Sequence, residues 1–216
     1  MVIEPTGGLA NRLRCVFSYV KEARVKGESL KVIWKFGDAC PGHFQDLFNP
    51  IDNIEFLKTN CDHLPIDYKG CYKHPVYDPD YSLLKPNIEI QSVVTDRLNK
   101  LGNFCSVHIR RTDHIELAKR ANKWTQDSLF IDFINYHHHL PIYISTDNPQ
   151  TWQEFKNLYC DRVVFDWWSP RNALRQSSLR EAVIDLWVCK GANEFLGSGW
   201  SSFTDLILDL RGDRFV

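Results

Sequence analysis

The chain has 216 residues, a length that is enough for one large domain or two small ones, and its formal net charge is −1. This near-neutral balance argues against binding to nucleic acid or to an anionic membrane surface, although it is compatible with a local basic pocket. The seven cysteines are scattered without a CxxC pair, which predicts neither a disulfide framework nor a zinc site, and the lack of a membrane-length apolar run and of a signal-peptide pattern predicts a cytoplasmic protein.

The first half of the chain alternates short strands with helices. Apolar residues recur at helical spacing after the first strand, and Gly27 is expected to end that helix. Asn87 is a candidate cap for a second helix and Gly102 its stop. The elements expected here are a strand at 2–3, a helix ending near 26, a strand at 30–36, a loop with a short helix at 41–48, a strand at 54–58, irregular structure with at most short strands at 60–86, and a helix at 87–100.

The second half repeats the alternation of strand and helix. The elements expected here are a strand at 104–109, a helix at about 123–139, a strand at 141–146, a helix ending near 159, a strand at 162–166, a Trp-rich loop, a helix at 177–190, a strand at 192–196 and a last helix. Repeated strand–helix order predicts parallel sheets with right-handed crossovers. We therefore expect an α/β protein of two Rossmann-like domains, residues 1–100 and 101–216, whose sheets face each other across a cleft.

A glycine turn, Gly7-Gly8, separates the first expected strand from the first expected helix. A helix start of this kind presents free backbone N–H groups and the positive end of the helix dipole to an anion. The spacing is neither GxGxxG nor a Walker loop, so an ordinary strand–helix connection is the simpler interpretation.

Two adjacent arginines, Arg110 and Arg111, follow the strand expected at 104–109. The carboxyl ends of parallel strands are where ligands bind in α/β proteins. A pair of guanidinium groups at such an end suits a dianion such as a diphosphate, because each stays charged and binds oxygens in a bidentate manner. The alternative is that both arginines form ordinary ion pairs with surface carboxylates.

Other candidate residues have an ordinary structural explanation as well as a functional one. Ser201 and Ser202 follow the glycine turn at 197–199 and are expected either to cap the last helix or to bind phosphate oxygens. Asp185 is either a solvated helix carboxylate or an acceptor for N1 and N2 of a guanine. His108 is either a core residue or a catalyst. The candidate general bases lie just after the arginines, and spacing does not choose among them: Asp113, His114 and Glu116.

Taken together, four stretches resemble a superfamily of fucosyltransferases that comprises α1,6-fucosyltransferases, bacterial chitooligosaccharide fucosyltransferases and protein O-fucosyltransferases. These stretches are Gly7-Gly8-Leu9-Ala10-Asn11-Arg12, His108-Ile109-Arg110-Arg111-Thr112-Asp113, Asp185, and Ser201-Ser202-Phe203-Thr204. The resemblance implies a GT-B fold, GDP-fucose as donor, a glycan acceptor, inversion at the anomeric carbon and no metal or other cofactor. It also implies that 1–100 is the acceptor-side domain and 101–216 the domain that binds the GDP-sugar.

The resemblance assigns a role to each matching residue. Arg110 would hold the β-phosphate and assist departure of GDP, and Arg111 would support that site or contact the acceptor. The remaining substrate contacts would be His108 and Asp185 at the guanine and ribose, Ser201, Ser202, Phe203 and Thr204 around the diphosphate, and Gly8, Asn11 and Arg12 from the amino-terminal turn.

Two features of the chain depart from this family. Glu116 matches the glutamate thought to act as base in the α1,6 enzymes only if a gap is allowed. The chain is also much shorter than typical members. Two alternatives therefore stay open: use of another GDP-hexose such as GDP-rhamnose, and a non-catalytic relative that binds a nucleotide sugar or a glycan.

Overall fold

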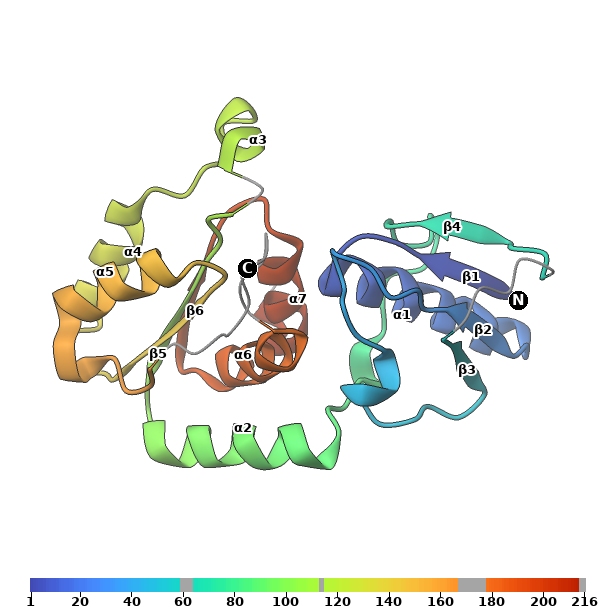
Figure 1. Ribbon diagram of the computed structural model, residues 1–216, viewed down its shortest axis with the longest axis horizontal. Helices are drawn as coiled ribbons and strands as arrows, with labels where there is room; N and C mark the ends of the chain where they lie inside the picture. Colours follow the sequence, from blue (N-terminus) through green and yellow to red (C-terminus); the bar gives the residue numbers. More distant parts are fainter. Residues whose placement is uncertain (59–63, 113–114, 167–177, 214–216) are drawn as a thin grey trace. The chain divides into compact units, whose positions relative to one another are not determined.

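A computed structural model of the protein describes residues 1–58, 64–112, 115–166 and 178–213 (Figure 1). The chain divides into two compact units, Met1–Ile90 and Gln91–Val216. Each unit contains one parallel sheet, so the predicted α/β class with two parallel sheets is confirmed. The predicted division after residue 100 falls at the carboxyl end of a helix, Ile88–Leu101, that begins in the first unit.

The first unit is a four-stranded parallel sheet in the order β3-β2-β1-β4. Helix α1 packs on it with Leu13, Val16, Phe17 and Val20 buried, as the helical spacing predicts. Strands β2 and β3 begin at the predicted residues and end within three residues of the predicted ends, because both are mainly apolar segments bounded by turns. The elements are β1 (Val2–Pro5), α1 (Leu9–Lys26), β2 (Leu30–Ile33), a 3-10 turn (Phe44–Asp46), β3 (Ile54–Leu57), β4 (Tyr68–Gly70) and a 3-10 turn (Tyr81–Leu83).

Glycines set both ends of α1. Gly7 has a φ of 80°, and a Cβ there would lie 3.2 Å from the Nδ2 atom of Asn11. Gly27 has a φ of 68° and directs its N–H to the last carbonyls of the helix, as expected for a helix stop. The turn between β1 and α1 therefore depends on the left-handed conformation that glycine adopts without strain.

Asn87 caps helix α2 (Ile88–Leu101), as predicted, because its Oδ1 atom accepts the N–H of Ile90 at 3.0 Å. We expect Asn87→Ala to lower the free energy of unfolding by about 1 kcal/mol, since this donor would lose its partner. Asn87→Asp retains the acceptor and is expected to keep most of that stability. Denaturant titration of the two variants tests the cap; equal losses in both would contradict it.

The second unit is a three-stranded parallel sheet in the order β6-β5-β7. Helices α4 and α5 lie on one face of it, and α6 and α7 on the other (Figure 1). After α2 come β5 (Cys105–Ile109), α3 (Ile115–Arg120), α4 (Asp127–Tyr136), β6 (Ile142–Thr146), α5 (Pro149–Tyr159), a 3-10 turn (Cys160–Arg162), α6 (Leu179–Gly191), β7 (Glu194–Gly197) and α7 (Ser202–Arg211).

The two faces of this sheet differ in chemistry. Towards α4 and α5, Val107 and Ile109 pack with Phe130, Ile134 and Phe155 in a hydrophobic core. The alternate residues of β5 and β6 point to the other face, and they are polar: Ser106, His108, Tyr143 and Ser145. A polar layer therefore lies under α6 and α7, and His108 and Ser145 extend it towards the carboxyl ends of the strands.

Two predicted elements of this unit are wrong. The strand expected at 162–166 is replaced by the 3-10 turn and a single bridge between Ile142 and Val163. Arg162 instead donates to the carbonyls of Ile134, His137 and Leu140 at the end of α4, which draws the chain out of the sheet. The helix expected at 123–139 is shorter and begins at Asp127, with α3 as a separate helix before it.

No helix within the described ranges combines the length and the apolar character that crossing a membrane requires.

Candidate anion site at the carboxyl ends of strands β5, β6 and β7

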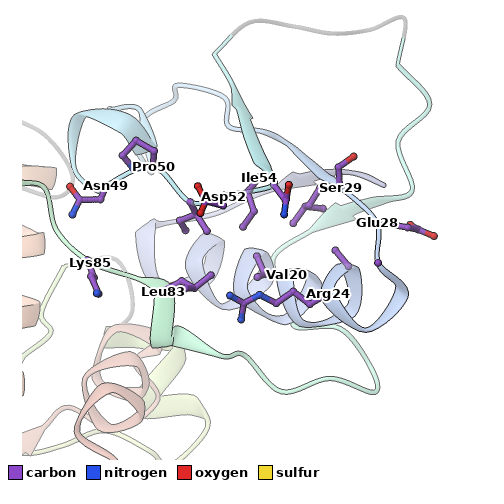
Figure 2. Close-up of a pocket in the computed structure, with 15 residues that line it drawn as sticks. Val20, Arg24, Glu28, Ser29, Asn49, Pro50, Asp52, Ile54, Leu83 and Lys85 are labelled. Atoms are coloured by element: carbon purple, nitrogen blue, oxygen red, sulfur yellow. The ribbon is translucent and has the colours of Figure 1, made fainter.

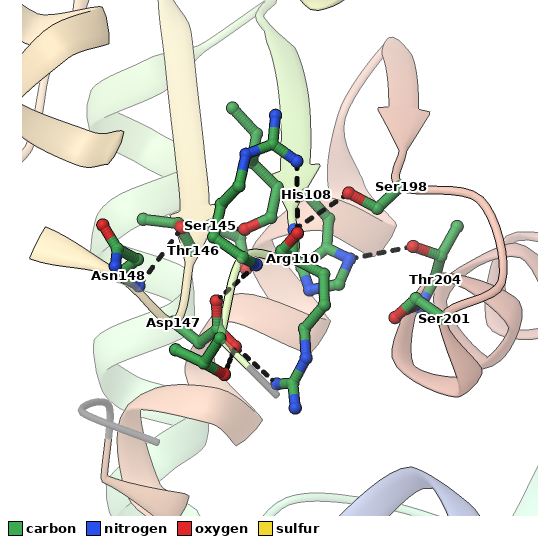
Figure 3. A network of polar contacts seen from close by, with 12 residues as sticks. His108, Arg110, Ser145, Thr146, Asp147, Asn148, Ser198, Ser201 and Thr204 are labelled. Atoms are coloured by element: carbon green, nitrogen blue, oxygen red, sulfur yellow. Dashed lines mark hydrogen bonds and ion pairs between the residues drawn. The ribbon is translucent and has the colours of Figure 1, made fainter. Parts of the chain in front are cut away.

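Three polar residues meet where the strands of the second sheet end (Figure 3). Arg110 follows β5, Asp147 follows β6 and Ser198 follows β7. The N–H of Arg110 donates to Ser198 Oγ at 2.9 Å, and its Nη1 atom lies 2.7 Å from Asp147 Oδ2. Parallel strands bring their carboxyl ends to one edge, so residues 37 and more positions apart become neighbours.

Asp147 is a site residue that the sequence did not single out. Its side chain is 7% exposed, and it also accepts the N–H of Arg111 at 2.9 Å and the hydroxyl of Thr112. The signal available in the sequence was its position directly after the strand expected at 141–146. The strand order that places β6 beside β5 cannot be read from that position alone.

Arg111 points away from Arg110. Its guanidinium forms an ion pair with Asp127 and lies over the ring of Trp124 at 4.3 Å from the centroid. Its Nη1 atom also donates to the carbonyl of Arg110 at 3.2 Å. Since Asp127 is 55% exposed while Asp147 is buried, the two guanidinium groups have different environments: that of Arg110 pairs with Asp147, whereas Arg111 reaches Asp147 through its backbone N–H.

His108 links β5 to α7 from inside the sheet. It is buried, its Nδ1 atom lies 2.8 Å from Thr204 Oγ1, and its ring contacts that of Phe203 at 4.8 Å. The pKa of His108 is lowered to about 3, mainly because burial disfavours the charged imidazole; the nearby Asp147 opposes this change and Arg110 adds to it. The imidazole is therefore neutral at physiological pH and contributes hydrogen bonds rather than charge.

The turn before α7 is packed so closely that it requires glycine. A Cβ at Gly197 would lie 2.3 Å from Thr204 Cγ2, and one at Gly199 would lie 2.7 Å from the carbonyl oxygen of Lys123. Ser201 caps α7, with its Oγ accepting the N–H of Thr204 at 3.4 Å, and Ser202 begins the helix. The predicted capping role of Ser201 is confirmed, and the amino end of α7 lies at the same edge as Ser198.

Asp185 belongs to the polar layer beneath α6. Its carboxylate accepts the hydroxyls of Tyr143 at 2.6 Å and Ser145 at 3.0 Å, and Arg97 reaches the same tyrosine oxygen at 2.7 Å. Burial raises the pKa of Asp185 to about 7, against the lowering effects of Tyr143, Arg97 and Ser145. The interpretation of Asp185 as a solvated carboxylate is therefore wrong, because it lies against a polar face of the sheet.

Of the three candidate bases, Glu116 falls within the described residues. Glu116 is exposed in the first turn of α3, and its Oε1 atom lies 3.7 Å from Lys119 Nζ. Asp113 and His114 lie outside the described residues. Among the residues that the structure does describe, no three His, Cys, Asp or Glu side chains come together as a metal ion would require.

The residues predicted to reach the substrate from the amino-terminal turn make contacts within the first unit. Arg12 is buried; its Nε donates to the Gly7 carbonyl at 2.9 Å, and its guanidinium lies over the Trp34 ring at 5.3 Å. Asn11 accepts from Arg14 at 2.9 Å, and Gly8 precedes the helix as its cap residue. Arg12 therefore stabilises the turn from within the first unit. Burial lowers the pKa of its guanidinium.

A hollow of about 800 Å³ lies at the opposite end of the first sheet (Figure 2). Its walls come from the carboxyl half of α1 and from the starts of β2 and β3, and its lining includes Arg24, Glu28, Asp52 and Lys85. The glycine turn follows the other end of β1, so this hollow is separate from it.

The chain matches no family model and no curated protein sequence. It does match solved structures. NodZ α1,6-fucosyltransferase soaked with GDP-fucose aligns over 97% of this chain and 91% of its own, at 15% identity and a TM-score of 0.68. Fucosyltransferase NodZ from Bradyrhizobium aligns over 95% and 90%, at 13% identity and a TM-score of 0.67. POFUT1 in complex with GDP-fucose aligns over 97% and 93%, at 9% identity and a TM-score of 0.66.

The chain has the fold of these fucosyltransferases. The resemblance found in the sequence is thereby confirmed at the level of fold, and the GT-B-like class with it. At 9–15% identity, the match shows that the fold is shared but does not assign roles to residues. The roles rest on the geometry around Arg110.

Proposed function

We propose that the protein is a GDP-fucose-dependent glycosyltransferase that moves fucose to a glycan acceptor with inversion and without a metal ion. The observation that carries the proposal is Arg110, fixed by Asp147 at the carboxyl ends of the parallel strands. It occurs in a fold shared with enzymes whose structures contain GDP-fucose. A cytoplasmic location and the lack of a nucleic-acid partner stay predictions from composition.

The chemistry follows from charge development. An acceptor hydroxyl attacks the anomeric carbon of fucose while the bond from that carbon to the β-phosphate oxygen breaks. The bonding electrons pass to the phosphate, and the hydroxyl proton passes to a base. Arg110 stabilises the growing phosphate charge, together with N–H groups at the start of α7. Such donors lower the barrier because they bind the transition state more strongly than the ground state.

The other predicted contacts keep their roles within this proposal. His108 and Asp185 hold the guanine and ribose end. Each oxygen of a carboxylate has two lone pairs, so the bonds of Asp185 to two hydroxyls are compatible with further acceptance from guanine. The residues proposed around the diphosphate are Arg111, Ser201, Ser202, Phe203 and Thr204, and those proposed from the first unit are Gly8, Asn11 and Arg12. Glu116, Asp113 and His114 stay candidate bases.

Calorimetry with GDP, GDP-fucose and UDP tests the proposal. We expect GDP and GDP-fucose to bind and UDP to bind at least about 10-fold more weakly, because a site built for guanine leaves polar groups unsatisfied with uracil. Failure of every GDP species to bind would refute the proposal. Competition by other GDP-hexoses, GDP-rhamnose among them, identifies the donor. Binding of GDP-fucose without transfer across a glycan panel would favour the non-catalytic alternative.

A further inference from the structure

The carboxylate of Asp147 is shared by three donors from the segment after β5. Arg110 Nη1 lies 2.7 Å from Oδ2, the Arg111 N–H donates to Oδ1 at 2.9 Å, and the Thr112 hydroxyl also donates to Oδ2. Asp147 therefore fixes the path of the segment as well as the guanidinium.

The backbone on either side of Asp147 is itself anchored. Thr146 Oγ1 donates to the Ile109 carbonyl at 2.7 Å, which joins the ends of β5 and β6. Asn148 caps α5 by accepting the N–H of Thr151 at 2.8 Å. A side chain held between the anchored end of β6 and the start of α5 has little freedom to move, so the Arg110 guanidinium that pairs with it is held as well.

The charge of Asp147 is unfavourable for simple anion binding. A buried carboxylate beside the arginine repels a diphosphate, and burial weakens screening by solvent and salt. A site that served only to bind the anion would gain from losing this charge. Orientation is a different requirement, because the guanidinium is planar and its hydrogen bonds are directional on a long, flexible stem.

We propose that Asp147 is a positioning residue for phosphate departure, acting through Arg110 by holding its guanidinium in the plane that the leaving β-phosphate needs. The inference rests on the proposed function. Asp147 itself does not touch the substrate. It weakens ground-state binding of the diphosphate and lowers the barrier to its departure.

Asp147→Asn separates these two effects. The amide oxygen still accepts one donor of the segment, but the charge that fixes the guanidinium is lost. We expect GDP affinity to stay the same or to increase up to about 10-fold, since repulsion is removed. We expect turnover of GDP-fucose to fall about 10- to 100-fold, as for misplaced catalytic groups. A merely structural role predicts parallel losses of GDP affinity and turnover.

The experiment measures GDP affinity by calorimetry and GDP release from GDP-fucose, with and without glycan acceptors. Asp132→Asn, an exposed change on α4, is the matched control and is expected to alter neither quantity. Thermal unfolding verifies that each variant is folded. If Asp147→Asn does not fold, Thr112→Val replaces it, because it removes one donor to Asp147 and keeps the charge. Thr112→Val is expected to lower turnover several-fold at unchanged GDP affinity.

The outcomes separate the two proposals. If the wild-type protein neither binds GDP nor turns over GDP-fucose, the proposed function fails. If the wild-type protein does both, unchanged turnover in a folded Asp147→Asn variant overturns the positioning role. A parallel loss of affinity and turnover overturns it as well. Should only Thr112→Val fold, unchanged turnover in that variant is the overturning result.

Discussion

Replacing Arg110 with alanine is expected to lower the turnover of GDP-fucose about 100- to 1,000-fold, which corresponds to about 3–4 kcal/mol in the barrier. The Arg110 side chain is 16% exposed and its Nη1 atom lies 2.7 Å from Asp147 Oδ2, so its charge is little screened where the phosphate charge would grow. Alanine also leaves Asp147 without its cationic partner, which adds repulsion towards the diphosphate. GDP affinity is therefore expected to fall together with the rate.

Two further variants sharpen this experiment. Arg110→Lys keeps the charge but not the planar fork, so its turnover is expected to lie between those of the wild type and Arg110→Ala. Arg24→Ala is the control, because Arg24 lies on α1 in an exposed ion pair with Asp80 that contributes little. Steady-state release of GDP measures all three. Wild-type turnover in Arg110→Ala would exclude the leaving-group role.

The parts of the fold that the sequence predicts well are those decided by local patterns. Helix α1 and strand β5 follow from apolar spacing and from the glycines that bound them. The strand expected at 162–166 fails because pairing depends on neighbours elsewhere in the chain. An apolar run such as Val163-Val164-Phe165 has the composition of a strand, but Arg162 is bound to the end of α4 and directs the chain away.

The residues of the candidate site likewise divide into those that local sequence patterns indicate and those that depend on tertiary structure. Arg110 and Ser201 could be found because their positions at a strand end and a helix start are visible in the sequence. Asp147 could not, because its contact with Arg110 requires β6 to lie next to β5, and strand order is a tertiary property. The protonation of His108 and Asp185 was equally inaccessible, since it depends on how deeply each is buried and on which hydroxyls lie opposite.

Asp185 is expected to make the stability of the second unit depend on pH. The groups around it are Arg97 from α2, Tyr143 and Ser145 from β6, and Glu181 from its own helix. Burial disfavours the ionised Asp185 carboxylate most and Glu181 adds to that effect, while Tyr143, Arg97 and Ser145 oppose it. The folded protein therefore favours the protonated carboxyl.

The sign of the effect follows from this preference. The pKa of Asp185 is raised from 3.8 to about 7 in the folded protein, so its contribution is fully present below about pH 4 and is lost as the pH rises through 7. At about 1.4 kcal/mol per pH unit, the loss is on the order of 2–4 kcal/mol.

Asp185→Asn keeps an acceptor for Tyr143 and a donor for Ser145 without a charge. Denaturant titrations at pH 5 and pH 8 are therefore expected to show that the variant gains stability relative to the wild type at the higher pH, while Asp132→Asn follows the wild type. A constant difference between variant and wild type across this window would mean that Asp185 is ionised in the folded protein, and that Arg97 rather than protonation balances its charge.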